Sequence, residues 1–147
     1  MTAPHRHPGG EPVATLAALP PLERRVIRCL RLWCAGPDGP DEVHREIAGR
    51  LGERSADLVV EELGELLRLV AGHARRPLLG HAPECPCAGG DECVFARFVA
   101  LAAEGAREEA TLMAALLVRP DVALCLAGRA ETVGLGLMRQ MTPRMVQ

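Results

Sequence analysis

Residues 81–93 read His-Ala-Pro-Glu-Cys-Pro-Cys-Ala-Gly-Gly-Asp-Glu-Cys, and the interpretation of the whole chain depends on this stretch. It brings one imidazole and three thiols, from His81, Cys85, Cys87 and Cys93, into thirteen residues. Proline and glycine interrupt it and apolar side chains are scarce, so burial alone does not order it. We therefore expect a bound metal ion, zinc in the first place, to order this segment.

The four side chains have the spacing H-x3-C-x-C-x5-C. Zinc prefers four tetrahedral ligands drawn from thiolates and imidazoles, and a site closed by four protein ligands is structural. Pro86 keeps the backbone between Cys85 and Cys87 extended, and the two glycines that follow allow the loop to turn back. We expect Cys93 in the first turn of the next helix, where the helix dipole favours a thiolate.

Three interpretations of this loop stay open. It holds a structural zinc ion, it holds an iron–sulfur cluster, or it binds no metal and carries incidental thiols or a labile redox group. Asp91, Glu92 or His73 could replace His81 as the fourth ligand. An exchangeable fourth position would allow a reactive role.

The composition indicates one helical domain. A chain of 147 residues with 48% apolar and 24% charged residues is typical of a single globular domain. Aromatic residues make up only 2% of it, so the core must consist of Leu, Val and Ala, which favours packed helices over a β-sandwich. All 17 basic residues are arginine, which we interpret as the coding bias of a GC-rich bacterial genome.

Charge and hydropathy indicate which partners and which cellular compartment to expect. The net charge of −2 predicts no general attraction to nucleic acid or to an anionic membrane. No apolar run reaches the roughly eighteen residues of a membrane span, and the run at 13–19, broken by two prolines, is a poor secretory signal. We expect a cytoplasmic protein, because clustered cysteines in a reducing compartment bind metal more often than they form disulfides.

Apolar periodicity predicts an all-α bundle of about six helices with the metal-binding loop between two halves. We expect a flexible N-terminal tail at 1–19 and a helical domain at 20–147. That domain divides into a three-helix half at 20–76, the Cys/His loop at 77–93 and a second helical half at 94–147. The expected helices are 21–35, 41–51, 55–74, 91 to the break at Gly105, 106–118 and 121–141. We find no strand pattern and no repeat.

Caps and glycines carry further expectations. Ser55 and Asp91 are the expected N-caps of the third and fourth helices. Three glycines of the last helix either weaken it or mark close contact with another helix. They are Gly128, Gly134 and Gly136.

The remaining cysteines and the arginines of the first helix receive ordinary interpretations. Cysteines among apolar residues behave as small hydrophobic groups, so we expect three of them in the core. They are Cys29, Cys34 and Cys125. Three arginines lie away from the apolar stripe of the first helix, and we expect them to face solvent or an acidic partner. They are Arg24, Arg28 and Arg31.

Residues 46–55 partly resemble the helix-turn-helix of transcription regulators. Ile47, Ala48, Leu51 and Gly52 match its packing positions, and Ser55 would cap the recognition helix. Two features depart from that pattern. An acid, Glu53, occupies a turn position that is usually apolar, and residues 41–65 contain eight acidic residues but only three arginines. Such a face repels phosphates, which argues against DNA binding.

Catalytic residues are scarce. The chain has no lysine, no tyrosine and a single serine, and Gly134 and Gly136 do not follow a strand as a dinucleotide-binding motif requires. We therefore predict a small metal-binding protein with an interaction or regulatory role rather than an enzyme. The sequence leaves open a protein partner or self-association. The alternatives are an iron–sulfur or thiol-based redox or metal sensor, and a helix-turn-helix regulator.

Overall fold

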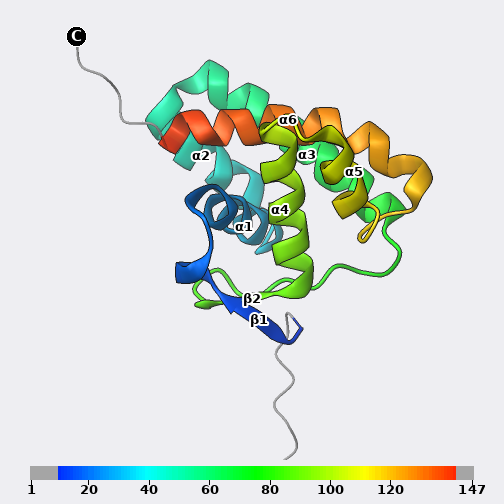
Figure 1. Ribbon diagram of the computed structural model, residues 1–147. Helices are drawn as coiled ribbons and strands as arrows, with labels where there is room; N and C mark the ends of the chain where they lie inside the picture. The colour runs from blue at the N-terminus through cyan, green and yellow to red at the C-terminus, as the bar shows by residue number, and fades with distance from the viewer. Residues whose placement is uncertain (1–9, 142–147) are drawn as a thin grey trace, which may run out of the picture.

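The computed structural model describes residues 10–141, and these form six α-helices with a small sheet at one end (Figure 1). The expected all-α architecture with about six helices is confirmed. The helices are α1 (Pro21–Cys34), α2 (Gly39–Leu51), α3 (Glu53–His73), α4 (Gly90–Ala103), α5 (Arg107–Ala114) and α6 (Pro120–Met141). A 3-10 helix, η1 (Leu16–Ala18), and two strands, β1 (Pro12–Thr15) and β2 (Cys87–Gly89), accompany them.

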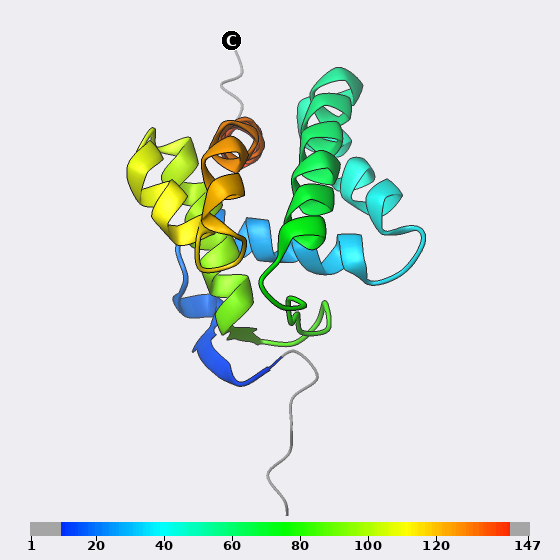
Figure 2. The same ribbon diagram turned by 90° about the vertical axis from the view of Figure 1, so that its right-hand side faces the viewer.

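Helix α6 is the central packing element. It contacts α3 on one side and α4 with α5 on the other, as Figure 2 shows. Fully buried apolar side chains from these helices meet there, among them Leu63 and Leu66 of α3, Phe95 and Phe98 of α4, and Leu137 of α6. The helices before and after the Cys/His loop therefore share one core.

The N-terminal segment differs from the expected flexible tail. Strand β1 pairs antiparallel with β2, and the amide of Leu16 donates to the carbonyl of Pro86 at 2.8 Å. The expectation of a tail over 1–19, and of no strands, is therefore wrong for residues 12–18, while residues 1–9 lie outside the described part. Pairing between segments so far apart leaves no periodic signal in four residues, which explains the difference.

Two helix starts also differ from expectation. Helix α3 begins at Glu53, not at Ser55, because Gly52 adopts a positive φ of 86° and turns the chain there. Helix α4 has Gly89 as its N-cap, and the amide of Gly89 donates to the carboxylate of Glu92 at 3.1 Å. Asp91 is thus not the cap. No helix within residues 10–141 is both long and apolar enough to cross a membrane.

Candidate functional site

A buried ion pair orders the loop that leads into α4. Arg31 of α1 donates from Nε to the carboxylate of Glu92 at 2.7 Å and from a terminal nitrogen to its other oxygen at 3.0 Å. The two side chains are 1% and 0% exposed. A guanidinium and a carboxylate paired in this forked way are strongly directional. The pair therefore connects α1 to the first turn of α4.

The same two side chains hold the loop backbone. Arg31 also donates to the carbonyl oxygen of Cys85 at 2.7 Å and to that of Cys87. Glu92 accepts from the amide of His81 at 3.2 Å, in addition to that of Gly89. We call Arg31 and Glu92 the clamp. In this structure the clamp supplies the order that we expected from a metal ion.

Asp91 holds the beginning of the loop. Its carboxylate accepts two hydrogen bonds from Arg76, at 2.8 and 2.7 Å, and one from the amide of Leu79 at 2.8 Å. The backbone just before the loop is also fixed, because the amide of Arg75 donates to the carbonyl of Leu117 at 2.9 Å. The start of the loop is thus held by α4 and by the segment between α5 and α6.

Hydrogen bonding decides the charge state of these carboxylates. Burial by itself raises the pKa of Glu92, but the hydrogen bonds from Arg31, Gly89 and His81 outweigh it, so the pKa lies below its usual value. For Asp91, burial is again opposed, here by Arg76 and the Leu79 amide, and the pKa is also lowered. Both groups are therefore carboxylates at neutral pH.

The burial of Arg31 corrects the expectation that it faces solvent. Arg31 is only 4% exposed, whereas Arg28 lies at the surface and pairs with Glu46 of α2. The sequence contains a signal for this burial, because Glu23, Ile27 and Arg31 recur every four residues and so share one helix face. Glu23 is also buried, and Arg97 of α4 lies 3.6 Å from it. Charges at both ends of this face pair with α4.

The structure brings two of the four predicted zinc ligands together. The Nδ1 atom of buried His81 lies 3.5 Å from the Sγ atom of Cys85. Cys87 begins β2, and Cys93 is the fourth residue of α4, where it lines a separate small cavity of about 300 Å³ with Glu23. Within residues 10–141, Cys87 and Cys93 do not join His81 and Cys85 in a group whose ligand atoms lie within 4.8 Å of one another.

Cys93 differs from the expected helix-dipole thiolate. Burial raises the pKa of its thiol, and the nearby charges of Glu92 and Glu23 raise it further. These effects outweigh the attraction of Arg31, which acts in the opposite direction. Cys93 is therefore a neutral thiol at neutral pH, and a metal ion would have to displace its proton.

Of the three remaining cysteines only Cys29 lies in the core as expected. Its burial raises the pKa of its thiol to about 12. Cys34 and Cys125 are exposed, so their assignment to the core is wrong. Cys34 is the last residue of α1, and Cys125 lies on the outer side of α6 next to exposed Leu124. A neighbouring apolar residue does not indicate burial when it is itself exposed.

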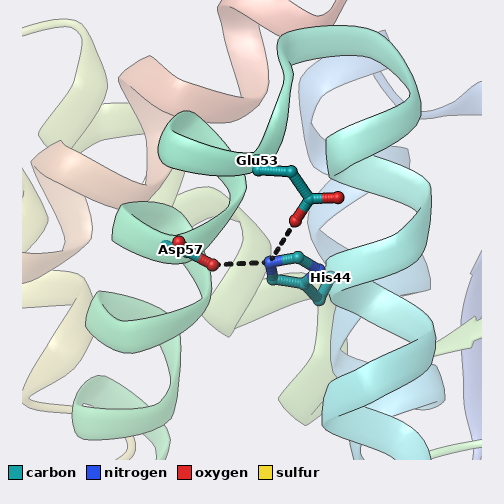
Figure 3. Close-up of side chains that lie close together, drawn as sticks. All are labelled: His44, Glu53 and Asp57. Carbon is teal, nitrogen blue, oxygen red and sulfur yellow. Dashed lines mark hydrogen bonds and ion pairs between the residues drawn. The ribbon is translucent and has the colours of Figure 1, made fainter.

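A second group of possible metal ligands joins α2 to α3 (Figure 3). The Nε2 atom of His44 lies 2.7 Å from a carboxylate oxygen of Asp57 and 3.6 Å from one of Glu53. The two acidic side chains are 70% and 80% exposed, respectively. The contacts connect the two helices across Gly52. Glu53 and Asp57 lie on α3, the helix that resembles a recognition helix. Their exposed carboxylates repel the phosphates of DNA, which argues against DNA binding.

A large cavity lies beside the clamp. It has a volume of about 920 Å³ and is bounded by α1, the C-terminal half of α3, the segment 74–83 and the start of α4. Aliphatic side chains form most of its wall, including Leu30, Leu67, Val70 and Leu78. The clamp and His81 contribute polar groups to the wall. A large apolar cavity with a few convergent polar groups is the usual form of a small-molecule site.

No protein-family model, curated protein or solved structure matches this chain. The functional argument therefore rests on the chemistry of the Cys/His loop and the cavity.

Proposed function

We propose that this chain is a small regulatory protein whose 77–93 loop binds one zinc ion. The supporting observation is the separation of 3.5 Å between His81 Nδ1 and Cys85 Sγ. A tetrahedral zinc ion about 2.3 Å from sulfur and about 2.0–2.1 Å from nitrogen separates these ligand atoms by roughly 3.5 Å. His81 and Cys85 thus offer one edge of a zinc tetrahedron, and Cys87 and Cys93 are the proposed third and fourth ligands.

Completion of this site requires the loop to rearrange. The thiols of Cys87 and Cys93 must approach the His81–Cys85 pair, while the clamp holds the carbonyl groups of Cys85 and Cys87 where they are. Zinc binding therefore competes with buried hydrogen bonds, which lowers the affinity below that of a preformed structural site. We infer a reversible metal switch in a reducing compartment such as the cytoplasm, rather than a permanent structural metal.

Metal analysis of the untagged protein tests this proposal. We expect one zinc ion per chain, released by a chelator and rebound upon addition of zinc. Replacing zinc with cobalt(II) should give thiolate-to-cobalt charge-transfer absorption. The variants Cys85→Ser and Cys93→Ser should lose the metal, while Cys125→Ser, which changes an exposed thiol on α6, should keep it.

Three results would contradict the proposal. The first is protein that takes up no zinc under reducing conditions. The second is equal loss of zinc in Cys125→Ser and Cys85→Ser. The third is a brown protein containing iron and sulfide, which would establish the iron–sulfur alternative instead.

A further inference from the structure

One of the arginines that line the cavity beside the clamp has no carboxylate partner within residues 10–141. Three arginines line it, and two of them are paired internally, Arg31 with Glu92 and Arg76 with Asp91. Arg75 donates from Nε to the carbonyl of Ala115 at 2.9 Å, and within residues 10–141 no carboxylate pairs with it. Its terminal N–H groups therefore remain as donors for an anionic group at the cavity wall.

The rest of the wall selects an aliphatic partner. Most of it consists of leucine, valine, alanine and proline, and no Phe, Tyr or Trp side chain from the described residues lines it. Aromatic ligands gain specific energy from stacking on aromatic side chains, which this wall does not provide. An aliphatic chain gains from the non-directional burial of apolar surface, which this wall does provide.

We propose that this cavity binds a small amphipathic carboxylate with a saturated aliphatic chain. The chain lies against Leu30, Leu67 and Val70, and the carboxylate accepts hydrogen bonds from Arg75. The volume of about 920 Å³ lies within the range of roughly 300–1,000 Å³ that small-molecule sites span. The proposed carboxylate site requires no bound zinc, so it is tested in the presence of a chelator.

Calorimetric titration with decanoate below its micellar concentration tests the site. We expect saturable binding of one decanoate per chain. Decyltrimethylammonium, which has the same chain and the opposite charge, should bind at least tenfold more weakly. Arg75→Gln should weaken decanoate binding about tenfold, and Arg75→Lys should restore part of it, because a lysine keeps the charge without the planar fork.

Two neighbouring residues of α3 provide a matched pair of variants. Ala71 lines the cavity but is exposed, so Ala71→Trp should fill the cavity without disturbing the core, and decanoate binding should fall at least tenfold. Gly72 does not line it, and a side chain there meets open space, so Gly72→Trp should bind decanoate as the unchanged protein does. Helical circular dichroism establishes that both variants are folded.

Thiol protection gives a second readout that needs no variant. Cys34 lines the cavity and is exposed, while Cys125 is exposed on α6 away from it. Decanoate should slow the alkylation of Cys34 and leave that of Cys125 unchanged. No saturable binding, equal affinity for decyltrimethylammonium, or equal protection of both thiols would overturn the proposal.

Discussion

Arg31 and Glu92 form an ion pair that solvent scarcely reaches, and each also satisfies backbone groups of the loop. Taking two charges out of water is expensive, and their mutual attraction offsets that cost only when the remaining donors and acceptors are satisfied. Here they are, because Arg31 reaches two carbonyl oxygens and Glu92 reaches two amides. Removing either partner leaves the other as an uncompensated buried charge.

We predict that Glu92→Gln lowers the free energy of unfolding by about 3–5 kcal/mol, the range for breaking a buried pair. Replacing both partners, as Arg31→Met with Glu92→Leu, should cost less than the sum of the single changes, since no charge is left buried. Urea unfolding with a chelator present measures both effects. Arg28→Gln is the control, because its pair with Glu46 is half exposed and is worth at most about 1 kcal/mol. If Glu92→Gln is equally mild, the clamp does not hold the loop.

The pair between α1 and α2 predicts a small pH dependence. The hydrogen bonds from Arg28 lower the pKa of Glu46 below its usual value of 4.5, and burial opposes them only in part. The stabilisation is therefore fully present above pH 4.5 and is lost as the pH falls through the lower pKa of the folded state. Because Glu46 and Arg28 are 31% and 50% exposed, the effect should not exceed about 1 kcal/mol.

Unfolding of the unchanged protein and of Glu46→Gln, compared between neutral pH and pH 3, measures this effect. The stability difference between them should shrink as the pH falls, and added salt should shrink it at neutral pH as well. A difference that is the same at every pH would show that the pair contributes nothing.

At the scale of elements, two glycines let α6 approach its neighbours. A Cβ atom on Gly136 would lie 2.3 Å from a methyl group of Val59 in α3, and one on Gly134 would lie 2.7 Å from Ala103 in α4. A Cβ atom on Gly128 would meet nothing within 4 Å. Close helix contact, one of the two roles expected for these glycines, is therefore confirmed for Gly134 and Gly136.

The three glycines predict opposite effects of one substitution on the same helix. Gly136→Ala and Gly134→Ala should each destabilise the protein by about 1–3 kcal/mol, the cost of overpacking a close contact. Gly128→Ala should stabilise it by up to about 1 kcal/mol, because alanine is the better helix former at an exposed position. Thermal unfolding of the three variants measures this. A stabilising Gly136→Ala would mean that α3 and α6 move apart without cost.

At the scale of the molecule, one loop serves both proposed sites. His81 belongs to the proposed zinc edge and also lines the cavity, and the clamp lines that cavity as well. A rearrangement that brings Cys87 and Cys93 toward His81 must pull on the backbone that Arg31 holds. The two ligands therefore favour different arrangements of the same segment.

We predict negative coupling between zinc and decanoate. Saturating zinc should weaken decanoate binding, and saturating decanoate should weaken zinc binding by the same factor, because coupling free energies are reciprocal. Calorimetric titration of each ligand with and without the other measures the two factors. Two independent affinities would show that the loop does not connect the sites.

Some of the molecule followed from the sequence alone. Five of the six helices lie within two residues of their expected bounds, because helix formation depends on local periodicity and on nearby prolines and glycines, which a single sequence displays. The exception is α5, which ends at Ala114 and not at 118. The sequence also placed Gly134 within the last helix, because helical periodicity is a local property. The proximity of His81 and Cys85 also followed from the sequence, because only three residues separate them.

The tertiary structure alone decided which partner each buried charged group has and which segments meet. Glu92, the partner of Arg31, lies 61 positions away in the sequence, and β2, the partner of β1, lies more than 70 positions away. No local sequence pattern predicts either contact. Periodicity assigns side chains to a helix face but does not say which neighbour covers that face. The expected burial of Cys34 and Cys125 was wrong for this reason, since both are exposed, as is Leu124. The sequence pointed to the loop between the helices, and the buried pair of Arg31 and Glu92, formed only when α1 meets α4, is what orders it.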